Sequence, residues 1–235
     1  MTADRRAEVA RNLATVRERI ATACRDAGRD PSEVSLTVVT KYFPASDVRL
    51  LAELDVRDVG ENKHQEAEAK AAKCADLGLR WHFVGNLQSN KAAAVARYAD
   101  VVESVDRAKL VAPLAKGAAA AGRAVDCLVQ VSLDPEEAAA GRGGARPADV
   151  GPLAQRIAAT DGLRLRGVMA VAPPGEDPAP AFARLAEVAA LVRDAEPSAT
   201  WISAGMSSDL EAAIAAGATH VRVGSAVLGA RPLLG

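Results

Sequence analysis

The stretch VSLTVVTK at residues 34–41 is an apolar run that ends on a lysine, and the segment 45–54 behind it has helical periodicity. This order of a short β-rich run and a helical segment recurs along the chain. Seven further strands are expected at 57–61, 81–86, 100–105, 126–132, 164–171, 200–205 and 219–224, with helices between them at 62–76, 88–98, 107–121, 147–160, 178–194 and 208–216. Strands that alternate with helices predict right-handed βαβ units and a parallel sheet.

Eight such units in 235 residues are enough to close an α/β barrel of the (β/α)8, or TIM, type with no second domain left over. The sequence therefore predicts one domain over 1–235. An open doubly wound sheet, which more usually has five or six strands, is the alternative. Residues 1–30 are expected to hold an extra helix that packs on the barrel, because apolar side chains recur there at steps of three and four: Val9, Leu13, Val16, Ile20, Ala23 and Cys24.

Composition and charge favour a small molecule as the main partner. The net charge of -1 gives no cationic field, so nucleic acid and anionic membranes are poor candidates. No apolar run approaches the roughly 20 residues of a membrane span, and the charged N-terminus lacks a signal peptide, so a cytoplasmic location is expected. Cys24, Cys74 and Cys127 lie far apart, which supports neither a disulfide scaffold nor a zinc site.

In a barrel of this type the active site lies at the carboxyl ends of the strands, so polar residues at those ends are the candidates. They are Lys41, Glu61, Asn62, His82, Asn86 and Arg222. Lys41 is one of only seven lysines, and a lysine at the end of an apolar strand indicates Schiff-base or carbonyl chemistry. The alternative is a lysine whose amine simply reaches solvent.

Two small-residue turns follow the last two expected strands, where such barrels frequently bind phosphate. We call them the phosphate cup: residues 205–208 (Gly-Met-Ser-Ser) and 224–225 (Gly-Ser). Ser208 and Glu211 also fit a capping box, and each turn could be only a helix start. Arg222 shares the strand face of Gly224 and is expected to point inward, either towards a ligand or to pair with Glu61 across the barrel.

The three histidines can each be explained by a structural position in the fold. His82 and His220 are each compatible with a hydrogen-bonded core histidine, and His64 is expected at the surface.

A lysine on the first strand, the phosphate cup and Arg222 together resemble the pyridoxal phosphate homeostasis protein family, of the PROSC or YggS type, which is related to the N-terminal barrel of alanine racemase. The resemblance covers nearly the whole chain. Its motifs are LTVVTKYFP (36–44), GENKHQEAEAK (60–70), WHFVGNLQSNK (81–91), RGVMAVAPP (166–174), SAGMSSDLEAAI (203–214) and VRVGSAVLG (221–229).

The resemblance implies that Lys41 carries pyridoxal 5'-phosphate (PLP) as a Schiff base and that Arg222 faces the pyridine nitrogen. It further implies that Ser207, Gly224 and Ser225 hold the phosphate and that Met206 belongs to the cofactor site. Asn62, His82 and Asn86 match the family's motifs at the mouth of the barrel. An arginine cannot give a proton to that nitrogen, which leaves the ring a weak electron sink. The segment GRGGARP (141–147) lacks the lysine often seen there, so its role stays open.

Three functions compete on this basis. The resemblance favours a cytoplasmic, monomeric PLP carrier with little or no catalysis of its own, which buffers the cofactor or delivers it to PLP-dependent apoenzymes. A PLP-dependent racemase would need a second domain and an opposing tyrosine, and the only tyrosines are Tyr42 and Tyr98. An aldolase that uses a lysine Schiff base on a sugar phosphate would explain the barrel, the lysine and the cup, but not the other motifs.

Overall fold

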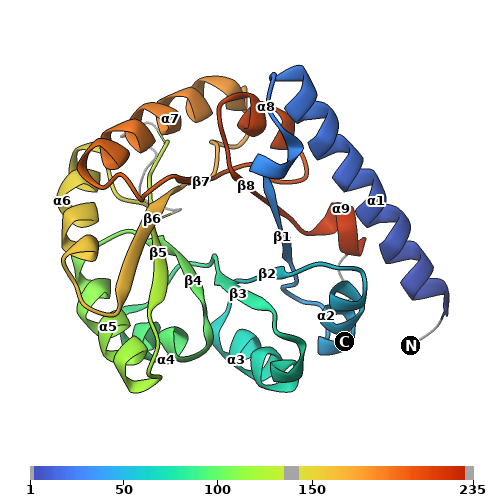
Figure 1. Cartoon of the computed structure of the whole chain (residues 1–235), viewed down its shortest axis with the longest axis horizontal. Coiled ribbons are helices and arrows are strands. Elements are labelled where there is room, and N and C mark those ends of the chain that lie inside the picture. The colour runs from blue at the N-terminus through green and yellow to red at the C-terminus, as the bar shows by residue number, and fades with distance from the viewer. Residues whose placement is uncertain (1–2, 135–142, 231–235) are drawn as a thin grey trace.

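A closed barrel of eight parallel strands forms the centre of the computed structural model, which describes residues 3–134 and 143–230 (Figure 1). The strands follow one another around the barrel in chain order: β1 Ser35–Val39, β2 Asp58–Glu61, β3 Arg80–Phe83, β4 Val101–Val105, β5 Val125–Gln130, β6 Leu163–Met169, β7 Trp201–Ser203 and β8 His220–Val223. The predicted (β/α)8 barrel is confirmed, and the open sheet is wrong because β1 pairs with both β2 and β8.

Helices surround the barrel, as Figure 1 shows. They are α1 Ala3–Asp26, α2 Ala45–Glu53, α3 His64–Lys73, α4 Ser89–Tyr98, α5 Val111–Ala120, α6 Pro147–Ala158, α7 Pro178–Ala195, α8 Leu210–Ala215 and α9 Ser225–Leu228. Short 3-10 helices lie at Pro31–Glu33, Ala75–Leu77 and Ala108–Leu110. Every expected helix has a counterpart within the described residues, and the turn after β8 leads, as its sequence predicts, into the short helix α9.

The apolar core lies between the strands and the helices. Fully buried side chains such as Val105, Leu114, Leu185 and Phe182 fill the space outside β4 to β7. Their burial removes apolar surface from water, which is the main favourable term in folding. This shell of packed helices holds the strand ends, and therefore the loops that follow them, in fixed positions.

The first helix packs on the outside of the barrel against its last elements (Figure 1). Its apolar stripe is buried in one cluster with residues of α8 and α9: Val9, Leu13, Val16 and Ile20 with Leu210, Ile214, Val227 and Leu228. The expected extra helix is thus present, and it ends before Gly28, whose φ of 66° favours glycine.

Two further expectations concern loops and membranes. In the segment 141–147, residues 141 and 142 lie outside the described residues, and the described part leads into α6. Among the helices of residues 3–134 and 143–230, none combines the length and the apolar character that crossing a bilayer would need.

Candidate functional site

A pocket of about 420 Å³ opens at the carboxyl ends of the strands. It brings together seven of the nine cofactor-binding residues proposed from the sequence: Lys41, Asn62, Met206, Ser207, Arg222, Gly224 and Ser225. Apolar side chains complete its walls, among them Val39, Phe43, Val84, Met169 and Val171. A concave site of this size, apolar with a few convergent polar groups, suits one small ligand.

Lys41 reaches the pocket from a short segment beyond the end of β1. The residue after it, Tyr42, has a φ of 72°, which is uncommon for a side chain of this kind. Two contacts hold this backbone. The Tyr42 N–H donates to Glu66 Oε1 at 2.6 Å, and Lys70 Nζ donates to the Thr40 carbonyl at 2.7 Å. The backbone on both sides of Lys41 is therefore fixed by side chains of α3.

Glu61 contacts Thr40 and Lys70, which hold the backbone next to Lys41, and it does not pair with Arg222. It accepts hydrogen bonds at one carboxylate oxygen from Lys70 Nζ at 2.7 Å and from Thr40 Oγ1 at 2.6 Å. Burial raises the pKa of Glu61 above its ordinary value, although the Lys70 ammonium acts in the opposite direction. The alternative of a Glu61–Arg222 pair across the barrel is wrong, because Glu61 pairs with Lys70 whereas Arg222 contacts Ser203 and Glu103.

Arg222 forms the floor of the pocket. Its guanidinium is buried and donates to Ser203 Oγ at 2.6 Å and to the Ala170 carbonyl at 2.8 Å, with Glu103 Oε2 at 3.7 Å. Burial lowers the pKa of Arg222 from its ordinary value, and the Glu103 carboxylate opposes that effect. The fixed cation is thus held in one orientation from below the pocket.

His82 does not line the pocket but lies on the far side of Glu103 from Arg222. Its Nδ1 is 2.7 Å from Glu103 Oε1 and its Nε2 is 2.8 Å from Asp58 Oδ1. Burial would lower the pKa of His82, but the two carboxylates outweigh it and raise the pKa to about 9. His82 is therefore a charged core histidine, and charges of alternating sign run from Asp58 through His82 and Glu103 to Arg222.

Asn86 and the two remaining histidines, His64 and His220, do not line the pocket. Asn86 lines a neighbouring cavity of about 340 Å³, which it shares with Asn62 and Lys91. His220 is a core histidine as expected, with Nδ1 2.8 Å from Thr219 Oγ1. His64 is largely buried and stacks on Tyr98, which corrects the expected surface position.

The phosphate cup lines one side of the same pocket, so the turns after β7 and β8 do face a common space. Gly205 has a φ of 91°, and a Cβ built there would lie 2.7 Å from the Ala213 Cβ, so this position requires glycine. The Met206 N–H donates to Asp209 Oδ1 at 2.6 Å, which closes the turn. Within the described residues, no hydrogen bond is made by the backbone N–H groups of Ser207 and Ser208.

The expected capping box of Ser208 and Glu211 is wrong. Asp209 precedes the first residue of α8 without a side-chain cap, and Glu211 instead accepts two hydrogen bonds from Arg19 of α1. The free N–H groups of the cup are consequently left available to a ligand.

The residues fit PLP by their chemistry. An amine, a turn with free N–H donors and a fixed guanidinium match the cofactor's aldehyde, phosphate and pyridine nitrogen. No place in the pocket was predicted from the sequence for Tyr42, which lines it, and Glu103, which lies 3.7 Å from the Arg222 guanidinium, was not identified. A signal for Glu103 was present, since it is the one charged side chain within the run VVESV at 101–105.

Comparisons with known proteins agree with this geometry. The family model described as "Alanine racemase, N-terminal domain" matches residues 9–232. The pyridoxal phosphate homeostasis protein of Mycobacterium tuberculosis is 41% identical, covering 98% of this chain and 95% of its own length. That of Pseudomonas aeruginosa is 42% identical, with 95% and 96% covered, and that of Escherichia coli K12 is 38% identical, with 95% and 97% covered.

Solved structures give the same result. PipY of Synechococcus elongatus, solved with PLP bound, is 34% identical with a TM-score of 0.81, covering 94% of this chain and 100% of PipY. Alanine racemase of Streptomyces coelicolor has a TM-score of 0.73 at 18% identity, covering 97% of this chain and 59% of the racemase, which is a likeness of fold alone.

Proposed function

Because this chain belongs to the pyridoxal phosphate homeostasis protein family, we propose that it binds PLP and takes part in the homeostasis of that cofactor. The observation that carries the proposal is the convergence of Lys41, the phosphate cup and Arg222 on one pocket. Each of these groups suits a different end of the same molecule, and PipY supports the assignment as a relative solved with PLP bound.

We assign a separate task to each part of the pocket. PLP supplies an aldehyde that condenses with amines and a pyridine ring that draws electrons from the condensed carbon. Lys41 supplies the amine, and its backbone is held in place by Glu66 and Lys70. Ser207, Gly224 and Ser225 bind the phosphate, with Met206 in the turn. Asn62 lines the mouth of the pocket, Asn86 lines the neighbouring cavity, and His82 acts from the core through Glu103 and Arg222.

Arg222 argues for a carrier rather than an enzyme. Its guanidinium is locked by Ser203 and the Ala170 carbonyl, and it has no proton to give to a pyridine nitrogen at neutral pH. Arg222 would therefore leave the pyridine nitrogen of PLP unprotonated, and PLP held in this way would be a weak electron sink. We therefore propose buffering of PLP, or its delivery to PLP-dependent apoenzymes, with little or no catalysis.

The proposal also covers the location, the oligomeric state and the partners of the protein. We propose a cytoplasmic monomer that works as one domain over 1–235, with no nucleic-acid or membrane partner. The net charge of -1 supports the absence of a polyanionic partner, since binding to nucleic acid relies on a cationic surface.

An absorption spectrum and peptide mapping test the proposal. The full chain purified with PLP should show a visible band, and borohydride should fix the cofactor on Lys41. Lys41→Ala should lose this covalent label but retain weak PLP binding through the cup and Arg222. The matched control is Lys63→Ala, which removes the lysine over the Tyr42 ring and should leave the label on Lys41.

Two results would contradict the proposal. One is labelling of Lys63 or Lys91 while Lys41 stays unmodified. The other is a colourless protein that borohydride traps only with a sugar phosphate, which would favour the aldolase.

A further inference from the structure

Three side chains of α1 contact backbone carbonyls next to the phosphate cup, one in the turn after β7 and two in α9. Arg19 Nη2 donates to the Ser207 carbonyl at 3.0 Å. Asn12 Nδ2 donates to the Val227 carbonyl at 3.1 Å, and Arg5 Nη2 donates to the Leu228 carbonyl at 3.0 Å. The first helix therefore contacts one half of the cup directly, at Ser207, and the helix that follows the other half, at Val227 and Leu228.

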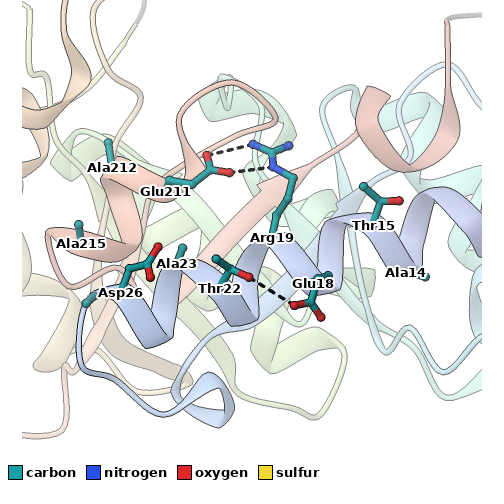
Figure 2. A pocket seen from close by; sticks show the side chains of 11 residues that line it. Ala14, Thr15, Glu18, Arg19, Thr22, Ala23, Asp26, Glu211, Ala212 and Ala215 are labelled. Carbon is teal, nitrogen blue, oxygen red and sulfur yellow. Dashed lines mark hydrogen bonds and ion pairs between the residues drawn. The ribbon is translucent and has the colours of Figure 1, made fainter.

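Arg19 has the most direct relation to the cup, because its partner is a cup residue. Its Nε and Nη2 also donate to the two carboxylate oxygens of Glu211, at 2.8 and 2.9 Å. Figure 2 shows this bidentate pair joining α1 to α8. A fork of this kind fixes the plane of the guanidinium, so the remaining bond to the Ser207 carbonyl has a defined direction.

The carbonyl of Ser207 and the N–H of Ser208 belong to the same peptide group. A trans peptide is planar, and its C=O and N–H point in opposite directions. Because Arg19 draws the carbonyl towards α1, the Ser208 N–H is turned the other way, towards the pocket that Ser208 lines. That N–H has no partner among the described residues, so it is ready to donate to a ligand.

We propose that Arg19 is a positioning residue for phosphate: by fixing the Ser207–Ser208 peptide, it aims the Ser208 N–H at the phosphate of PLP. This inference rests on the proposed function and adds to it a residue that never touches the ligand. Glu211 largely balances the charge of Arg19, so Arg19 acts through orientation of the peptide rather than through its electric field.

Besides this pair, α1 and α8 share a buried apolar cluster that includes Ile20, Leu210 and Ile214. A second, larger pocket of about 880 Å³ lies between α1 and α8, and small side chains such as Ala23, Ala212 and Ala215 line much of it (Figure 2). Of the residues that the structure describes, only Arg19 hydrogen-bonds to the Ser207 carbonyl. Removing Arg19 therefore frees the Ser207–Ser208 peptide to rotate.

The test compares PLP with pyridoxal, which lacks the phosphate, in titrations of the cofactor-free full chain. Arg19→Ala should raise the Kd for PLP about two- to tenfold, the equivalent of one net hydrogen bond of roughly 0.5–1.5 kcal/mol. The Kd for pyridoxal should change less than about twofold, since pyridoxal makes no phosphate contact. The matched control is Arg25→Ala on the same helix. Within the described part of the chain the Arg25 side chain hydrogen-bonds to Glu18 and Thr22 and not to the cup, so binding should not change.

Two milder variants and one spectroscopic measurement complete the design. Arg19→Lys keeps the charge but not the fork, and Glu211→Gln loosens the guanidinium, so both should weaken PLP binding less than Arg19→Ala does. These variants decide the question if Arg19→Ala does not fold. In NMR spectra, addition of PLP should shift the Ser208 amide resonance. The shift should be larger in the unaltered chain than in the Arg19→Lys variant.

Each outcome separates the inference from the proposed function. Equal losses for PLP and pyridoxal would mean that Arg19 only supports the fold, and unchanged PLP binding would also overturn the inference. If the unaltered chain does not bind PLP at all, the proposed function fails, whatever Arg19 does.

Discussion

Replacing Glu103 by glutamine should destabilise the protein in a way that depends on pH. Glu103 carries the only negative charge between His82 and Arg222 among the described residues, and it is fully buried. Burial would raise the pKa of Glu103, yet its contacts with His82, Arg222 and Ser203 lower the pKa to about 2. Glu103→Gln keeps the shape of the side chain and removes the charge.

The size of the change in folding free energy is worked out from the pKa of His82. Its pKa rises from 6.5 to about 9 through Asp58 and Glu103 together, and at 1.36 kcal/mol per pKa unit the two contacts jointly correspond to about 3 kcal/mol of folding free energy. Because the pKa in the folded protein is raised, this stabilisation is fully present below pH 6.5 and is lost as the pH rises through 9. The lowered pKa of Glu103 describes the same contact from the other side, so the two contributions are not added. Removing one member of a buried pair costs about 3–5 kcal/mol.

Urea unfolding of the cofactor-free chain between pH 4.5 and 9.5, followed by tryptophan fluorescence and circular dichroism, measures the effect. The free energy of unfolding should differ between the unaltered chain and Glu103→Gln by about 3 kcal/mol or more near pH 5–6, and less above pH 9. Glu187→Gln, which alters an exposed carboxylate, is the control and should show no such trend. A difference that stays constant across this pH range would refute a charged His82 in the folded protein.

Three other expectations concern the cup and the chemistry. Replacing both Ser207 and Ser225 by alanine should weaken PLP binding by a few kcal/mol, at about 1.5–3 kcal/mol per charge-assisted hydrogen bond, and weaken pyridoxal binding much less. Equal losses in the two titrations would make the serines structural. Gly205→Ala should lower the stability by about 1–3 kcal/mol, because its φ of 91° and the nearby Ala213 Cβ reject a side chain, and a thermal melt measures this. With L-alanine in heavy water, α-deuterium followed by NMR should enter slowly, and turnover of about 1–10³ per second would instead favour the racemase.

The repeating units of the barrel could be predicted because each depends on a local pattern. All eight strands lie within or beside their expected ranges, since runs such as VSLTVVTK contrast clearly with the helical segments. The cup was predictable for a similar reason, because glycine and serine cluster directly after β7 and β8. The observed strands are shorter, as pairing stops before residues such as Lys41 turn into the loops.

The partners of charged side chains could not be predicted in this way. Glu211 fits a capping box locally, but it pairs with Arg19, which is distant in sequence and adjacent only after the barrel closes. Glu61 and Arg222 face the same interior, yet each has a closer partner in Lys70 and Ser203. Choices among competing partners depend on distances in three dimensions, which residue spacing does not contain.

The packing of α1 on α8 and α9 constrains how the protein is made. Ile20 leaves the ribosome about 190 residues before its neighbour Leu210, a wait of roughly 10–40 s at ~5–20 residues per second. During that time the apolar stripe of α1 lacks the surface that finally buries it. A nascent chain with such a stripe exposed is a substrate for chaperones, and stalling of synthesis before residue 210 would yield an aggregation-prone product.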